Sequence, residues 1–272
     1  MFSTFFKTKP VIDEASKEWI FDTFAWCIAN LDGDFFKHKS ELILPNNTFY
    51  PGSSSSVEEM ANTIFANTIK YTGMTSWPIR IVSSDRFTPK PIPQLSFESG
   101  LRGENCKVSC KANYEVGQEN TAPVIDIAFH SSQLNQPQDL IAYLVQSQAR
   151  ILVNQNGMLP PGGKDVLAQT IDLVACFMGY GVIFANTAYQ FKGGCGSCNN
   201  QNLNRQAALP ELETVYALAL FCVIKGVDIK SIKKDLKSHL YKPFRQAHKE
   251  ITLYLQQTTN PTHIQLSITN NK

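Results

Sequence analysis

The sequence predicts an α+β fold, with strands mainly in the first half of the chain and helices mainly in the second. Two long apolar segments between residues 138 and 191 have helical spacing, and the second is apolar on nearly every side. Segments with the short apolar runs or alternation of strands occur mostly between residues 40 and 130. We therefore expect a small, mainly antiparallel sheet packed on a helix-rich half that contains a central helix pair.

The chain is long enough to bury a sizeable hydrophobic core, with 272 residues and a mass of 30.4 kDa. We predict a single α+β domain over residues 1–257, with strands mostly at 40–130 and helices mostly at 138–256. Residues 258–272 are expected to form a tail that is frayed or adds one edge strand.

Two helices are expected before residue 75. The apolar spacing over residues 13–31 is that of an amphipathic helix. The run Ser56-Val57-Glu58-Glu59 has the pattern of a capping box, in which Ser56 accepts from the Glu59 amide and the Glu59 carboxylate reaches back. The helix that begins there is expected to end at Gly73.

Four short segments favour strands or a hairpin rather than helices. They are an apolar run at 41–44, WPIRIV at 77–82, an irregular hairpin within 95–116, and APVIDIAF at 122–129, which alternates between two faces.

The second half is expected to be helical apart from two loops. The central pair is separated by a Gly/Pro-rich break at 156–163, and a loop follows the pair. Further helices are predicted at 211–224, 227–239 and 242–255.

Charge and composition narrow the class of protein. A formal net charge of +2 and a pI near 8.1 favour neither a nucleic acid nor a membrane as partner. The apolar run at 171–188 contains Asp172, Gly179, Gly181 and Asn186, so we interpret it as a core helix. Seven cysteines and an N-terminus without the pattern of a secretory signal favour reduced thiols in the cytoplasm.

The cysteines allow a zinc site. Cys195 and Cys198 enclose only Gly196 and Ser197, and this spacing can chelate one metal ion. Cys106 and Cys110 could supply the second pair of a four-cysteine structural zinc. The alternative is that the glycines around Cys195 form a tight turn and the thiols are ordinary small residues.

Asp126 and His130 share one face of the predicted strand at 122–129. They are a possible acid/base or metal-ligand pair, although such a pair is more often two surface residues. The lysines between residues 225 and 249 are expected to form a solvated helix face. The phosphate-binding and serine-hydrolase motifs G-x-x-x-x-G-K-[ST], G-x-G-x-x-G and G-x-S-x-G do not occur.

Several stretches taken together resemble a family of uncharacterised bacterial proteins. They are LILPNNTFYPG, MANTIFANTIKYTGMTSWPIRIV, the central pair, GGCGSCNNQNLNRQAAL and ETVYALALFCVIKG. Relatives in the wider group have a zincin-like H-E-x-x-H on the helix before the break, followed by an Asp shortly before a G-x-G on the next helix. The two His bind Zn²⁺ and the Glu activates the bound water.

The resemblance implies a degenerate metal site in this chain. Gln146 and Arg150 stand at the two His positions, Ser147 stands at the Glu position, and only Asp172 matches a ligand. A fixed guanidinium repels a divalent metal ion. We therefore expect Arg150 to form a buried ion pair with Asp172 where the metal would have been.

These observations favour a cytoplasmic, non-catalytic, zincin-like scaffold that binds a protein or a small ligand, without a cofactor other than a possible structural zinc. Two alternatives remain open. One is a metal-dependent hydrolase whose ligands the sequence does not identify, with Asp126, His130 and Asp172 as the first residues to test. The other is a binding module stabilised by zinc on the four cysteines.

Overall fold

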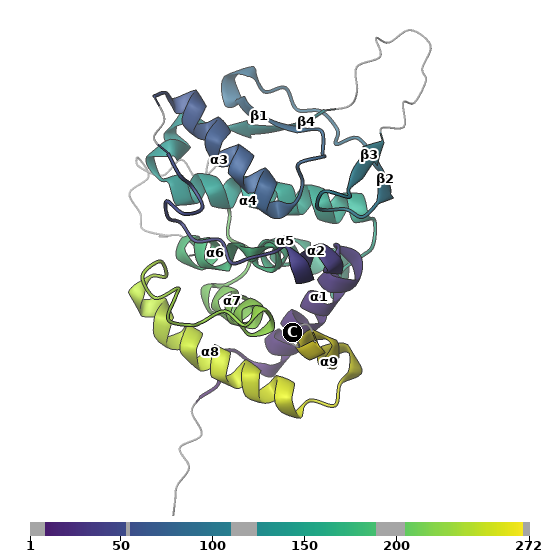
Figure 1. The fold of residues 1–272 in the computed structure, drawn as a ribbon, viewed down its shortest axis with the longest axis vertical. Helices are drawn as coiled ribbons and strands as arrows, with labels where there is room; N and C mark the ends of the chain where they lie inside the picture. The colour runs from purple at the N-terminus through teal and green to yellow at the C-terminus, as the bar shows by residue number, and fades with distance from the viewer. Residues whose placement is uncertain (1–8, 53–54, 110–123, 189–204, 269–272) are drawn as a thin grey trace, which may run out of the picture.

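The computed structural model describes residues 9–52, 55–109, 124–188 and 205–268. Its helices and strands stack in layers, with α3 and the strands at one end of Figure 1, α4 to α6 in the middle, and α7 to α9 at the other end. The main elements are α1 (Glu14–Asn30), α2 (Gly33–His38), α3 (Val57–Thr72), β1 (Ile79–Ser83), β2 (Ser96–Ser99), β3 (Lys107–Ser109), β4 (Ile125–Phe129), α4 (Pro137–Asn156), α5 (Leu167–Ala175), α6 (Gly181–Thr187), α7 (Glu211–Lys225), α8 (Ser238–Gln257) and α9 (Pro261–Ile268).

The α+β prediction is confirmed. The capping residues of α3 explain where that helix begins and ends. The Ser56 hydroxyl accepts a hydrogen bond from the Glu59 amide at 3.1 Å. The Glu59 carboxylate accepts from the backbone amide of Ser55 at 2.8 Å rather than from Ser56. Gly73 adopts a left-handed conformation with φ 74° and ends the helix.

The prediction of a mainly antiparallel sheet is wrong for the described residues. β1 and β4 pair in parallel, with Ile79 opposite Ile125, and β2 pairs with β3 in an antiparallel hairpin. The parallel pairing follows from the connection, because more than forty residues separate the two strands and can return the chain to the same end of the sheet. In the part of the chain that the structure describes, each of the two sheets has two strands.

Residues 41–44 do not form the predicted strand. The backbone amide of Ile43 donates instead to the carbonyl of Gly179, at 2.9 Å. Gly179 has φ 99° and lies in a π-helical turn, Cys176–Tyr180, that separates α5 from α6. A Cβ atom on Gly179 would lie 2.1 Å from the carbonyl oxygen of Glu41, so only glycine allows this close approach.

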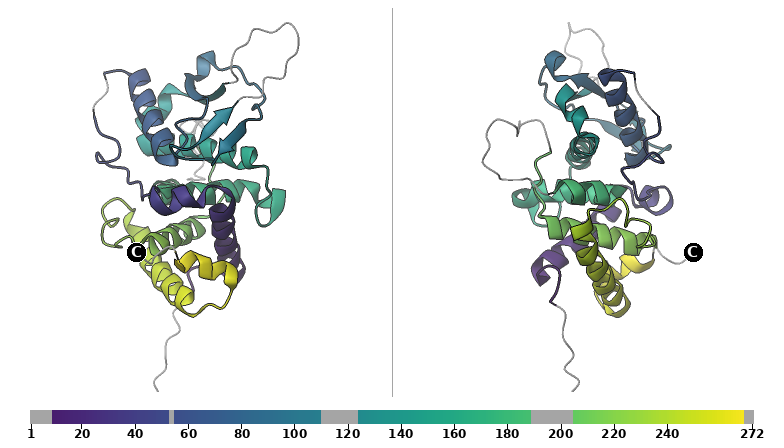
Figure 2. Two further views of the ribbon diagram at one scale, coloured as in Figure 1. Left: turned by 45° about the vertical axis from the view of Figure 1, so that its right-hand side comes forward. Right: turned by 90° about the vertical axis from the view of Figure 1, so that its left-hand side faces the viewer.

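The helical segment from Gly163 to Thr187 is long and apolar enough to cross a membrane, but 78% of its most apolar window is buried inside the fold. It contacts α1, α4 and α7, and Figure 2 shows it between the two ends of the molecule. The prediction that this run is a core helix is therefore confirmed.

Two predictions near the C-terminus are wrong. Most of the predicted helix at 227–239 is a series of turns, with bonds such as Ser231 amide to Asp228 carbonyl at 3.0 Å, and α8 begins only at Ser238. The tail contains the helix α9 instead of an edge strand. This helix packs on α1 and α8, with the side chains of His263 and Leu266 buried.

Candidate functional site

The predicted site residue Asp172 lies on α5 and is fully buried. Its carboxylate accepts hydrogen bonds from Gln146 Nε2 at 2.7 Å and Arg205 Nη1 at 2.9 Å. It also accepts from the backbone amides of Ala208 and Leu209, at 2.8 and 3.0 Å. Gln146 donates to Oδ1 and the other three groups donate to Oδ2, so each carboxylate oxygen has a donor from the protein.

Arg205 extends this cluster to the next helix. Its Nη2 donates to the carbonyl of Phe184 at 3.0 Å and to Thr187 Oγ1 at 3.1 Å. The guanidinium also lies 4.2 Å from the centre of the Phe184 ring. The ion pair thus joins α5, α6 and the segment that leads into α7, which is a structural role.

The predicted Arg150–Asp172 pair is wrong. Gln146 does contact Asp172, but Arg150, one helical turn further along α4, is exposed to solvent. Donors from residues 205–209 occupy Oδ2, Gln146 donates to Oδ1, and Asp172 is fully buried away from the exposed Arg150. The Ser147 hydroxyl donates to the Tyr143 carbonyl at 3.0 Å on its own helix and does not face Asp172.

Asp126 and His130 do not form a pair. The Asp126 carboxylate receives two hydrogen bonds from Arg80 on the neighbouring strand, at 2.5 and 3.3 Å, and these bonds lower its pKa. His130 Nδ1 accepts from the Ser132 amide at 3.2 Å and caps a short 3₁₀ helix, Ser131–Asn135. Each residue therefore has its own local partner.

Only one of the four candidate zinc-binding cysteines lies in the described part of the chain. Cys106 is buried, and this burial raises the pKa of its thiol. Cys110, Cys195 and Cys198 lie outside the described residues. Within the ranges that the structure describes, no group of three or more His, Cys, Asp or Glu side chains is arranged to hold a metal ion.

A cleft lies elsewhere, between α2, the end of α3 and the loop at 99–105. It has a volume of about 800 Å³. Sequence analysis did not predict this site, because it brings together three segments that are far apart along the chain. The only signal in the sequence was the presence of glycines at positions 73, 100 and 103. In the structure all three glycines have positive φ.

A buried arginine connects the segments that form the cleft. Arg102 is 2% exposed, and it donates to the carbonyls of Thr72 (2.8 Å) and Leu31 (3.4 Å) and to the Ser40 hydroxyl (3.1 Å). Burial lowers the pKa of its guanidinium to about 10, so the group still carries its charge at neutral pH. These bonds tie α1, α3 and residue 40 to one side chain.

Asp32 fixes the other wall of the cleft. It is the one described residue other than glycine with positive φ, 68°. Its carboxylate accepts from the amide of Phe35 at 3.2 Å and from the amides of Leu101 and Arg102, also at 3.2 Å. These bonds join the start of α2 to the 99–105 loop and offset the strained backbone.

The Phe35 ring lines the cleft and is closely packed. The Arg102 guanidinium lies 4.5 Å from its centre, and a Cβ atom on Gly73 or Gly103 would come within 2.6 or 2.7 Å of its atoms. The ring therefore has a fixed place, and the glycines are required for it.

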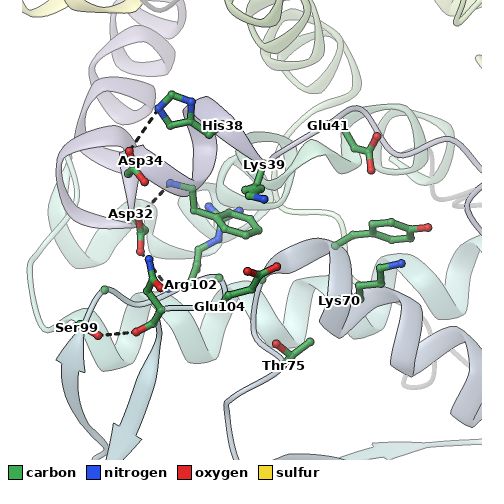
Figure 3. A pocket seen from close by; sticks show the side chains of 16 residues that line it. Asp32, Asp34, His38, Lys39, Glu41, Lys70, Thr75, Ser99, Arg102 and Glu104 are labelled. Carbon is green, nitrogen blue, oxygen red and sulfur yellow. Dashed lines mark hydrogen bonds and ion pairs between the residues drawn. The ribbon is translucent and has the colours of Figure 1, made fainter.

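Charges of both signs stand around the cleft. Figure 3 shows Lys39 and Glu104 in the middle of the view, with Glu41 and Lys70 at one end. All four side chains are exposed. Asp34 and His38 approach each other at 3.5 Å at the opposite end. A bound molecule could thus meet an ammonium group and a carboxylate in one place.

Comparison with known proteins gave no relative: no family model, no curated protein and no solved structure matches this chain.

Proposed function

We propose that this chain is a non-catalytic binding protein, and that the cleft between α2, the end of α3 and the 99–105 loop binds a small polar ligand. The ligand carries both a cationic and an anionic group. The observation that carries this proposal is the cleft itself, about 800 Å³ in volume and lined by lysines and carboxylates on a fixed frame.

The frame supports binding because it is held in place before any ligand arrives. Arg102 and Asp32 connect the three segments that form the walls, through hydrogen bonds to backbone groups. A wall that is already ordered loses little conformational freedom on binding, which improves affinity.

The mixed charges support the choice of ligand. Lys39 and Lys70 can bind a carboxylate or phosphate, and Glu41 and Glu104 can bind an ammonium group. A ligand with a single charge would lie next to side chains of the cleft that carry the same charge as the ligand. A zwitterion satisfies both sets, and this complementarity gives selectivity.

The proposal keeps the binding role inferred from the zincin-like resemblance but moves the ligand away from Asp172. That carboxylate is enclosed by Gln146, Arg205 and two backbone amides. The resemblance itself stays a prediction. A cytoplasmic location also belongs to the proposal, and it is supported by Cys27, Cys106, Cys176 and Cys222, which are buried free thiols.

Three compounds with one carbon skeleton test the proposal. We expect 5-aminovalerate to shift the backbone amide signals of Lys39, Lys70 and Gly103 in a saturable way in ¹H–¹⁵N NMR titrations. Valerate lacks the ammonium group and pentylamine lacks the carboxylate, so each should bind roughly tenfold more weakly, about 1.4 kcal/mol for the lost charge-assisted contact.

Matched variants give the control. Lys70→Met should weaken 5-aminovalerate binding, whereas Lys164→Met, at an exposed lysine outside the cleft lining, should leave it unchanged. Equal binding of all three compounds, or shifts confined to residues outside the cleft, would contradict the proposal.

A further inference from the structure

A second cavity, of about 470 Å³, lies between the first turns of α3 and α4 and the loop at 45–52. Its chemistry differs from that of the charged cleft. Its lining combines apolar side chains (Tyr50, Met60, Ile64, Ile141, Pro45, Pro51 and Pro137) with the polar residues Asn46, Asn47, Glu59, Thr63 and Gln138. Small-molecule sites in proteins commonly combine this range of volume with an apolar lining and a few polar groups.

The cavity has no cationic side chain among its described lining residues, and one ionised carboxylate. Its one acidic residue is Glu59, whose carboxylate accepts from the Ser55 amide at 2.8 Å and the Ser55 hydroxyl at 2.6 Å. These bonds lower the pKa of Glu59 and hold the carboxylate at the start of α3. Burial raises the pKa of Tyr50, so that phenol is neutral.

The loop that closes the cavity is held in one conformation. The amides of Phe49 and Tyr50 donate to the Asn46 carbonyl, at 3.2 and 3.0 Å. The Tyr71 hydroxyl donates to the Phe49 carbonyl at 3.3 Å, and the two rings meet edge to face at 5.6 Å. The cavity therefore exists without a ligand to order its wall.

Gln138 gives the cavity a directional polar group. Its Oε1 accepts from Asn186 Nδ2 at 3.2 Å. The Asn186 amide is fixed in turn, because it donates to the Asp235 carbonyl and accepts from the Lys237 amide at 2.8 and 2.9 Å. With Oε1 occupied in this way, the Nε2 donors of Gln138 are the end of the amide that a ligand can use.

We propose that this cavity is a second binding site, for an uncharged small molecule with an aromatic or alicyclic body and one carbonyl oxygen. The body packs against Tyr50, Ile64 and Ile141, and the oxygen accepts a hydrogen bond from Gln138. This site is independent of the charged cleft and of the zwitterionic ligand proposed for it.

Acetophenone and benzoate, which share a ring of the same size, test the proposal by NMR titration of the ¹⁵N-labelled full chain. Acetophenone should shift the amide signals of Thr63, Ile64 and Ile141 in a saturable way. Benzoate, which carries a charge, should bind at least tenfold more weakly because this cavity offers it no cation.

Two tryptophan variants on α3 show whether the cavity is the binding site. Thr63→Trp covers the mouth of the cavity and should weaken acetophenone binding at least tenfold. Ala66→Trp places the same ring on an exposed position of α3 outside the cavity and should leave binding unchanged. The amide spectra of both variants report whether the fold is retained.

A third variant tests the polar contact and remains informative if Thr63→Trp does not fold. Gln138→Glu keeps an oxygen for Asn186 but removes the Nε2 donors, so it should weaken acetophenone binding about fivefold. Absence of saturable shifts with acetophenone, equal binding of benzoate, or unchanged binding in Thr63→Trp overturns the proposal. None of these results depends on 5-aminovalerate, so the two proposed sites fail separately.

Discussion

The Asp172 carboxylate and the Arg205 guanidinium lie 2.9 Å apart, and both side chains are almost completely buried. The two residues are 33 positions apart in the sequence. Arg205 lies in the segment before α7 and Asp172 in the apolar central segment, so the ion pair attaches the second half of the chain to the core. Its value to stability is best measured by removing one partner.

Arg205→Met should lower the free energy of unfolding by about 3–5 kcal/mol, because it leaves a buried carboxylate without its cation. Urea denaturation followed by circular dichroism measures this difference. Arg150→Met is the matched control, since Arg150 is exposed and its loss should change stability by less than about 0.5 kcal/mol. The reverse order of the two effects would restore the Arg150–Asp172 pair that the sequence suggested.

Gly179→Ala should destabilise the protein by about 3 kcal/mol or more, through unfavourable φ and through overlap with a neighbouring carbonyl. The new Cβ would lie 2.1 Å from the Glu41 oxygen. Gly157→Ala separates the two causes, because Gly157 has φ 73° but nothing lies within 4 Å of its Cβ position. That variant should lose only about 1 kcal/mol. Equal losses in thermal or urea unfolding would show that the contact with Glu41 is unimportant.

His263→Ala should release α9 from the rest of the fold. His263 is buried, its Nε2 lies 2.9 Å from Asp22 Oδ1, and its Nδ1 lies 2.6 Å from the Tyr254 hydroxyl. Loss of both contacts should cost about 1–3 kcal/mol locally, since each intramolecular hydrogen bond contributes roughly 0.5–1.5 kcal/mol. Hydrogen exchange at the amides of residues 263–266 should become faster. Thr262→Ala, at an exposed position of the same helix, should leave exchange slow.

The Arg80–Asp126 pair predicts a pH dependence of stability. Hydrogen bonding to Arg80 lowers the pKa of Asp126 below its usual value of 3.8. The folded state therefore favours the ionised form, so the stabilisation is complete above pH 3.8 and is lost as the pH falls through the lowered pKa. The urea midpoints of the wild type and Asp126→Asn should differ by a constant amount between pH 5 and 7 and converge below about pH 3.8. A difference that grows in acid would contradict this assignment.

Local rules in the sequence predicted the elements that depend on neighbouring residues. The Ser56 cap, the end of α3 at Gly73 and the strands around residues 79 and 125 all follow from a few adjacent side chains. The direction in which β1 and β4 pair depends on a long connection, and alternation of residues carries no information about it.

The predictions from the sequence were wrong where the local structure depends on a hydrogen-bonding partner far along the chain. The apolar residues 41–44 have the composition of a strand, but their hydrogen-bonding partner is the carbonyl of Gly179, far along the chain. The true partner of Asp172 lies in a polar stretch without periodicity, so Arg205 gave no sign of being buried. Pro261 was an available signal for the start of α9, because proline favours the first turn of a helix.

The charged cleft was missed for the same reason. Its frame joins Asp32, Gly73 and Arg102 from three separate segments, and each of these residues alone suggests only a turn, a helix end or a surface cation. The contact of Gln146 with Asp172, in contrast, follows from the packing of two helices that are consecutive in the chain.

The position of the segment from Gly163 to Thr187 between α1, α4 and α7 also constrains how the chain can fold during synthesis. Its covering helices come from both sides of it in the sequence, and α7 ends only at Lys225. A nascent chain that has not yet released α7 from the ribosome must therefore expose one of its most apolar stretches to the surrounding water. We expect the core of this protein to close only after α7 has left the ribosome, and chaperones that shield such stretches to assist until then.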